Sequence, residues 1–342
     1  MRLSRESLQR EAVATGFRPE VLEKVFLLLD LLEAINEHPG LSGKLALKGG
    51  TALNLFLFDA PRLSVDIDLN YITTDYITIG DQVGENYVGA EEREAMRADR
   101  PHVEQAVELI ARRLELTPQT PKREEHAGRS WVLRYASALG GTDNLKIDLV
   151  YTLRLPLWPP ARRDSRQIGS RQVRDVLVLD DHELASGKLA ALLARRTSRD
   201  LFDAHELLLH HPLDPEKLRL AFVVYGAMNP EDWRGVRAED IGPATRDLDA
   251  YLRPLLREDV TGSGTDLNTG LKWEERLMDE VREALSAVLP LRANELAFLD
   301  RLLDAGEIEA ERLTGDAALA GIIRRHPALL WKAQNVRRHK SK

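Results

Sequence analysis

The chain has 342 residues and a formal net charge of −7 at pH 7. Hydrophobic residues make up 43% of it and charged residues 30%, the balance of a soluble globular protein with a sizeable core. There is no cysteine, which excludes disulfides and thiolate zinc sites. The sequence contains no apolar run long enough for a membrane span and does not begin like a signal peptide, so we expect a cytoplasmic protein.

The acidic balance gives no overall signature of nucleic-acid binding, but two segments are locally basic. Residues 323–342 hold seven Lys or Arg residues and no acid, and residues 154–174 hold six Arg residues against one acid. Either segment could contact phosphate. The alternative is a solvated surface or a frayed terminus.

Apolar spacing and chain breakers predict the elements of the first half. In chain order we expect a helix over residues 5–37, a strand over 41–47, a helix over 51–58 entered through glycine, and a strand over 63–71. A polar loop and helix start over 75–100 follow, and then a helix over 102–116. Strands over 131–137, 144–152 and 173–179 come next, before a helix over 184–196 that continues through 201–210.

Beyond residue 210 the pattern changes to helical segments separated by proline and glycine. We expect a flexible connection at 261–270 and helices over 273–289, 293–305 and 317–325. The sequence therefore predicts an α/β (α+β) fold with a mixed sheet over residues 1–210, followed by a mainly helical domain over residues 211–342.

The segment from Leu63 to Tyr71 alternates with period two, so Ser64, Asp66 and Asp68 share one face of a strand. Two unpaired carboxylates this close repel each other, and a divalent cation relieves the repulsion. Ligands that are all oxygens favour magnesium, with manganese as an alternative. A strand edge that carries protective charges is the competing interpretation.

Lys48-Gly49-Gly50-Thr51 precedes this strand. The glycines leave the backbone open to a phosphate, and a helix that starts near Thr51 would add unpaired N–H groups. Asp148 is the expected third carboxylate, because it falls on the polar face of a strand that can pair with the strand of Asp66 and Asp68. In this order, the motifs predict a site for a nucleoside triphosphate and magnesium.

A second constellation combines Lys188, Arg195 and Arg199 with Asp200 and Asp203. Lys188 and Arg195 lie about 20° apart around a helix, and Arg199 would follow on the same face if the helix continued. These cations could bind a triphosphate or RNA, with the acids orienting them or activating a hydroxyl. An amphipathic helix with a structural Arg–Asp pair is the alternative.

Three histidines, His205, His210 and His211, fall late in this helical stretch. His210 and His211 point in different directions around a helix, so they do not favour a metal site. We expect packing or a charge at the helix C-terminus instead.

Four ordered segments carry a resemblance to a known family: residues 48–53, 62–69, 146–148 and 188–203. The chain resembles the AbiEii-type (MenT-like) toxin nucleotidyltransferases of the DNA polymerase β-like nucleotidyltransferase superfamily. The resemblance implies transfer of a nucleotide from an NTP, often to the 3′ end of tRNA, and a cognate antitoxin. The helical C-terminal half carries no motif that matches the family.

By position, the resemblance implies catalytic roles for Asp66, Asp68, Lys188 and Asp200, and metal binding by Asp66, Asp68 and Asp148. The residues that we expect to bind the nucleotide are Lys48, Gly49, Gly50, Thr51, Ser64, Lys146, Lys188, Arg195 and Arg199.

The expected reaction is attack of a hydroxyl on the α-phosphorus, with pyrophosphate leaving. Three alternatives stay open at this point. They are nucleotidylation of a protein or small molecule, which the acidic net charge favours, transfer of the terminal phosphoryl group, and a binding module with a relic site.

Overall fold

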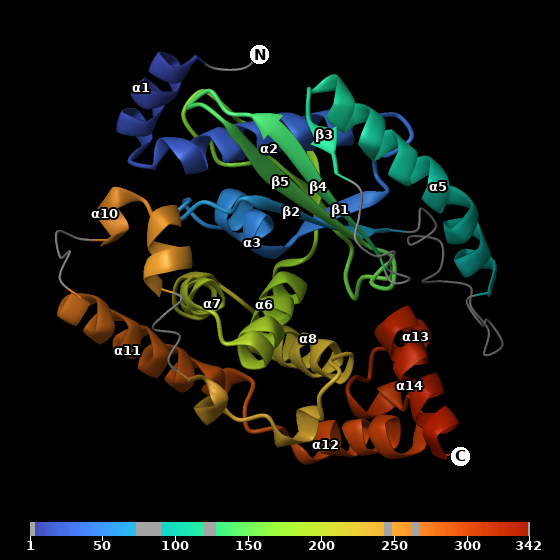
Figure 1. Cartoon of the computed structure of the whole chain (residues 1–342). Helices are drawn as coiled ribbons and strands as arrows, with labels where there is room; N and C mark the ends of the chain where they lie inside the picture. Colours follow the sequence, from blue (N-terminus) through green and yellow to red (C-terminus); the bar gives the residue numbers. More distant parts are fainter. Residues whose placement is uncertain (1–3, 73–89, 120–127, 243–247, 262–266, 341–342) are drawn as a thin grey trace.

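The computed structural model describes residues 4–72, 90–119, 128–242, 248–261 and 267–340 (Figure 1). Its centre is a seven-stranded sheet in the order β3-β4-β5-β2-β1-β7-β6. The strands are β1 (Leu45–Lys48), β2 (Asp66–Tyr71), β3 (Thr117–Pro118), β4 (Gly128–Ala136), β5 (Thr142–Val150), β6 (Ala161–Arg163) and β7 (Val176–Val178). The predicted mixed sheet, followed by a helical C-terminal region, is confirmed.

The central strands have mixed directions. β2 is antiparallel to β1 and parallel to β5, and β1 is parallel to β7. The alternation predicted for β2 and β5 is present, because Ile67, Leu69, Ile147 and Leu149 are all buried. The acidic residues between them therefore lie on the opposite face of the sheet.

The single helix predicted over residues 5–37 is two helices, α1 (Arg5–Thr15) and α2 (Pro19–Glu37). Gly16 ends α1 in the left-handed conformation with φ 71°, and Pro19 begins α2. The first strand is shorter than expected, because residues 41–44 form a turn before β1.

Helix α5 (Ala90–Arg113) starts twelve residues before the predicted helix at 102–116, and it contains Pro101. Of the polar loop and helix start expected over 75–100, residues 75–89 lie outside the described residues, and residues 90–100 are helical. The predicted strands at 131–137, 144–152 and 173–179 correspond to β4, β5 and β7 with shifted ends.

The helix predicted to run continuously to residue 210 is interrupted. Helix α6 (Asp181–Arg195) ends at Arg196, which has a φ of 56°, and α7 (Ser198–His210) begins after Thr197. The Thr197 side chain accepts a hydrogen bond from the Asp200 amide and so caps α7. Arg195 and Arg199 therefore belong to different helices, and the single stripe of cations predicted for them is wrong.

The C-terminal half is helical, and in Figure 1 helices α6, α7 and α8 (Pro215–Ala227) lie between the sheet and α11 and α12. The later helices are α10 (Glu258–Thr261), α11 (Leu267–Ala284), α12 (Ala293–Asp300), α13 (Ala317–Arg325) and α14 (Pro327–Lys340), with short 3₁₀ and π turns between them. Of the connection predicted at 261–270, Thr261 and residues 267–270 are helical, and residues 262–266 lie outside the described residues.

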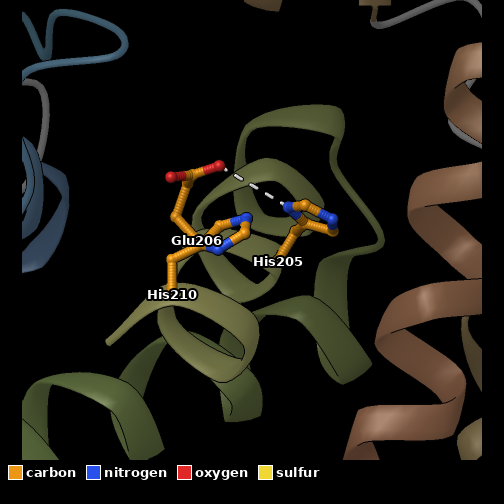
Figure 2. Close-up of side chains that lie close together, drawn as sticks. All are labelled: His205, Glu206 and His210. Carbon is orange, nitrogen blue, oxygen red and sulfur yellow. Dashed lines mark ion pairs between the residues drawn. The ribbon is translucent and has the colours of Figure 1, made fainter. Parts of the chain in front are cut away.

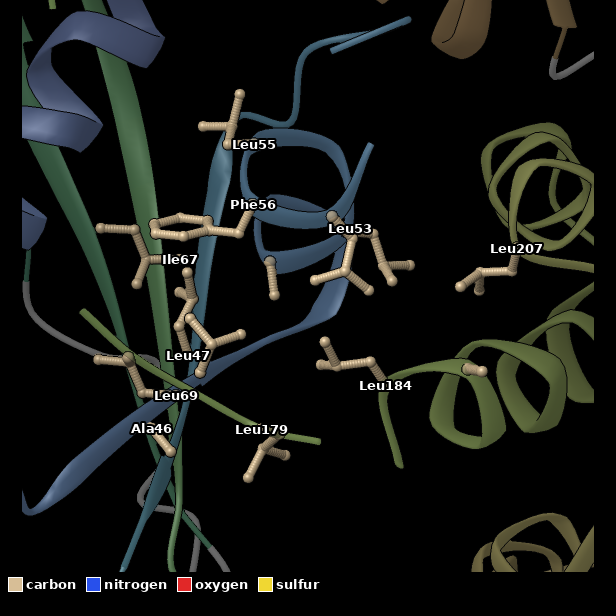
Figure 3. Packing of buried hydrophobic residues seen from close by; sticks show 14 of the residues in the cluster. Ala46, Leu47, Leu53, Leu55, Phe56, Ile67, Leu69, Leu179, Leu184 and Leu207 are labelled. Atoms are coloured by element: carbon tan, nitrogen blue, oxygen red, sulfur yellow. The ribbon is translucent and has the colours of Figure 1, made fainter. Parts of the chain in front are cut away.

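One apolar cluster joins the sheet to the helices (Figure 3). Leu47 of β1 and Ile67 of β2 pack beside Phe56, and Leu184 of α6 and Leu207 of α7 lie on the side that faces the segment after β1. This packing fixes α6 and α7 relative to the carboxyl end of β1. Among the described residues, no helix combines the length and apolar content that a membrane span needs.

Candidate functional site

The acidic face of the sheet is formed by two neighbouring parallel strands. In the register of β2 and β5, Asp66 lies opposite Lys146 and Asp68 lies opposite Asp148. The Lys146 ammonium donates to the Asp148 carboxylate. The sheet therefore brings together the three carboxylates that the sequence had placed on polar strand faces.

The glycine turn lies against one of these acids, Asp68. Gly49 begins the short helix α3 (Gly49–Ala52), which continues as a π turn over Leu53–Leu57, and its φ is 71°. A Cβ atom built on Gly49 would lie 2.2 Å from the Asp68 Oδ2 atom. A Cβ on Gly50 would lie 3.0 Å from the Ser64 hydroxyl oxygen. Glycine is thus required at position 49 by both its backbone conformation and its distance to Asp68.

We expect Gly49→Ala to abolish nucleotide transfer by displacing the Asp68 carboxylate, besides destabilising the fold by about 1–2 kcal/mol through its left-handed backbone. Gly141→Ala is the matched control, since Gly141 has a φ of 76° and nothing within 4 Å of its built Cβ. Urea unfolding and transfer assays of both variants separate the two effects. Equal activity of the two variants would contradict the proposed importance of this contact.

Burial raises the pKa of Asp66 and of Asp68 above the ordinary aspartate value. For Asp66 the charges of Lys146 and Arg199 oppose this effect, and for Asp68 the charge of Lys48 does so. Burial lowers the pKa of Lys48, against the attraction of Asp68 and Asp148. These carboxylates carry charge at a cost in free energy, so binding of a cation there would be favourable.

A cleft of about 320 Å³ opens beside the glycine turn. Gly49, Gly50 and Asp68 form one side of it, and α6 forms the other. The lining residues are Lys48, Gly49, Gly50, Asp68, Leu153, Leu179, Glu183, Leu184, Gly187, Lys188, Ala190, Ala191, Arg195 and Tyr225. Both constellations found in the sequence therefore reach the same cleft.

Lys188 is buried and is held by two carboxylates of α7. Its Nζ atom lies 2.8 Å from Asp200 and 2.8 Å from Asp203. Burial would lower the pKa of Lys188, but the two acids outweigh it and raise that pKa, so the ammonium stays charged. An ammonium has three donors, and two of them are directed at these acids. The third can serve a ligand in the cleft.

Asp203 is the centre of a buried ionic network. Its side chain accepts hydrogen bonds from the Arg62 guanidinium and, at 3.1 Å, from the Asn54 amide. Burial would raise the pKa of Asp203, but Arg62 and Lys188 hold it well below its usual value. The sequence suggested that Asp203 orients cations. It gave no sign of Asn54, and Arg62 appeared in it only as part of a motif.

The remaining residues that the sequence predicts to bind the nucleotide differ in their exposure and in their contacts. Arg195 is mostly exposed, and its guanidinium lies 3.2 Å from Asp200. Arg199 acts electrostatically on Asp66, on the acidic face of the sheet. Thr51 is fully buried, and its hydroxyl donates to the Asp66 carbonyl, so only its backbone could contact a phosphate.

Glu183 is a cleft residue that no motif of the sequence singled out. It is buried, and it accepts hydrogen bonds from the amides of Leu157 and Trp158 and from the Tyr225 hydroxyl. Burial outweighs these bonds and raises its pKa to about 7. Its partners lie far away in the chain, so no local pattern marks this residue.

Glu183→Gln is expected to flatten the pH dependence of stability. Because the pKa of Glu183 is about 7 in the folded chain and 4.5 in the unfolded chain, its protonation stabilises the fold fully below pH 4.5, and this contribution is lost as the pH rises to about 7. The difference is on the order of 3 kcal/mol. Urea unfolding at about pH 5 and pH 8 should show a larger loss of stability in the wild type than in the variant. Identical losses would contradict the raised pKa.

Comparisons with known proteins show the family of the chain and a related fold. The profile of a family described as the nucleotidyl transferase AbiEii toxin, type IV toxin–antitoxin system, matches residues 30–289, well over half of the chain. No curated protein matches the chain.

Among solved structures, MenT4, a nucleotidyltransferase toxin from Mycobacterium tuberculosis H37Rv, matches with a TM-score of 0.57 and 17% identity. The match covers 94% of this chain and 99% of that one, and it shows a shared fold. Since the family profile covers most of the residues that form the sheet and the cleft, the chain belongs to the AbiEii family of nucleotidyl transferase toxins of type IV toxin–antitoxin systems.

Proposed function

We propose that the chain transfers a nucleotide from an NTP to an RNA acceptor, the 3′ end of tRNA, with Mg²⁺ held by Asp66, Asp68 and Asp148. The observation that carries the proposal is that these carboxylates share one face of the sheet, with Asp68 against the Gly49 turn in a cleft that Lys48 and Lys188 also line. Membership of the family implies an NTP substrate and an antitoxin partner.

The donor set fits a hard divalent cation, because all three side chains offer carboxylate oxygens on one face of adjacent strands. Mn²⁺ would fit the same oxygens. When bound, such an ion stabilises charge that develops on the phosphoryl oxygens. The raised pKa of Asp66 and of Asp68 supports this assignment, because a cation would restore their charged forms.

In this proposal the residues of the chain bind and orient the triphosphate. The backbone of Gly49 and Gly50 allows close approach of phosphate, which could accept hydrogen bonds from N–H groups in the first turn of α3. Lys188, fixed by Asp200 and Asp203, would neutralise the pyrophosphate that leaves as the acceptor hydroxyl bonds to the α-phosphorus. Asp200 thus acts as a positioning residue for Lys188.

The two basic segments differ as candidates for binding the RNA acceptor. Arginines of residues 154–174 donate to acceptors within the fold, as Arg163 does to Asp181 and Arg166 to the Phe58 carbonyl. In helix α14, Arg338 and Trp331 are exposed, with an exposed fraction of 62% for Trp331, and Arg337 is exposed while it also interacts within the fold. An exposed aromatic ring beside cations is typical of surfaces that bind single-stranded RNA.

The experiment incubates the chain with α-labelled or γ-labelled NTP, purified tRNA and an RNA-free lysate. Label from the α position on tRNA supports the proposal. If only protein or small molecules carry the label, tRNA is not the acceptor. If only the γ-labelled NTP transfers its label, the chain is a phosphotransferase.

A charge reversal tests the RNA surface. Deleting residues 323–342 would also remove the buried Ile323 and Leu329, so the sharper variant is Arg337→Glu/Arg338→Glu. The matched control reverses Arg112 and Arg113, two exposed arginines at the end of α5. Only the α14 variant should weaken tRNA binding and reduce its salt dependence. Equal tRNA binding by both variants would exclude α14 as the RNA surface.

A further inference from the structure

A second cluster of metal-ligating side chains lies at the C-terminal end of α7, apart from the acidic face of the sheet. His205, Glu206 and His210 lie close together, and one ligand atom from each lies within 4.8 Å of the other two (Figure 2). The sequence predicted no metal site here, because His210 and His211 point in different directions around a helix. The His211 ring does point elsewhere, at 2.9 Å from Asp181, but Glu206 takes its place beside His205 and His210.

The buried member of the cluster has an unsatisfied ring nitrogen. His205 is 8% exposed, and its Nε2 atom lies 2.7 Å from a carboxylate oxygen of Glu280 on α11. Its Nδ1 atom is buried and has no hydrogen-bond partner, and the nearest Glu206 oxygen is 3.5 Å away. A ring protonated on both nitrogens would pair with Glu280 through Nε2 and with Glu206 through Nδ1. A metal ion between Nδ1 and Glu206 would take the place of the proton on Nδ1.

We propose that His205, Glu206 and His210 bind a transition-metal ion of the Zn²⁺ class, with Glu280 orienting His205. Two imidazole nitrogens and one carboxylate are a set of ligands that Zn²⁺ accepts in proteins, and solvent can supply a fourth. A carboxylate behind a ligating histidine fixes the ring and its tautomer. Imidazole is a poor ligand for Mg²⁺, so this site differs in metal preference from the carboxylates of the sheet.

The site would connect α7 to α11. Helix α7 carries Asp200 and Asp203 near its N-terminus, and these acids hold Lys188 in the cleft. A metal ion at the other end of α7 would stabilise this helix, on which the position of Lys188 depends. Glu280 of α11 would orient the ligating ring of His205. The metal is therefore structural in this proposal and takes no part in nucleotide transfer.

The test uses the full chain without a histidine tag, stripped with a chelator and kept in excess Mg²⁺ so that the carboxylate site is saturated. Zn²⁺ binding is measured by calorimetry, and Co²⁺ binding by its visible absorption. We expect the wild type to bind a single equivalent of Zn²⁺, to show the Co²⁺ absorption of nitrogen ligation, and to melt several degrees higher with Zn²⁺.

His210→Ala removes an exposed ligand and should abolish these responses without changing the circular dichroism spectrum. His211→Ala is the control, because its neighbouring ring lies outside the cluster, and it should bind Zn²⁺ like the wild type. Glu280→Gln should weaken binding roughly 10–100-fold. Absence of Zn²⁺ binding in the wild type, or equal affinity of wild type and His210→Ala, would overturn the proposal.

Discussion

Replacing Asp66 or Asp68 with asparagine is expected to lower nucleotide transfer by about 10³-fold or more while the chain stays folded. Asparagine keeps the shape of the side chain but removes the negative charge that would hold a divalent cation. Because burial already raises the pKa of both carboxylates, neutral side chains should be tolerated by the fold.

Transfer of α-labelled NTP to total RNA and lysate protein measures this effect, and a thermal melt checks the fold. Asp279→Asn is the control, since its side chain is 76% exposed on α11. The control should retain full activity. Activity of Asp66→Asn or Asp68→Asn near the wild-type level would remove these residues from the mechanism.

Asp203→Asn is expected to destabilise the chain by about 3–5 kcal/mol. The Asp203 carboxylate is fully buried, and it neutralises both Arg62 and Lys188, which are themselves buried. Asparagine would leave these cations short of one negative charge in a poorly solvated place. The variant should also lose transfer activity, because Lys188 loses one of the two groups that position it.

Urea unfolding measures the loss of stability, and Asp232→Asn is the control. Asp232 pairs with Arg234 at the surface with 55% of its side chain exposed, so its loss should be below about 1 kcal/mol. The double variant Arg62→Met/Asp203→Asn should lose less than the sum of the two single losses. Additive losses, or a loss for Asp203→Asn as small as for Asp232→Asn, would contradict a coupled network.

The acidic face of the site could be predicted because strand periodicity is local. Alternation in residues 63–71 and 144–152 fixes which side chains share a face, and apolar neighbours decide which face is buried. The pairing of β2 with β5 then places Asp68 opposite Asp148, on the polar face that the alternation predicts for each residue. The glycines before α3 indicated a close approach for the same local reason.

The cationic side of the cleft could not be predicted in the same way. The break between α6 and α7 falls at Arg196, a non-glycine residue with positive φ, where the sequence has no glycine or proline to mark it. The burial of Glu183 and the pairing of Asp203 with Arg62 depend on segments more than twenty residues away. Such contacts depend on tertiary packing, which a single sequence does not encode locally.

The most direct test of the account is a crystal structure of the chain with Mn²⁺ and a non-hydrolysable NTP analogue, with the metal located by its anomalous signal. We expect Mn²⁺ among the carboxylates of Asp66, Asp68 and Asp148, with the triphosphate against Gly49 and Gly50. Mn²⁺ and triphosphate bound away from these acids, with the acidic face empty, would contradict the account.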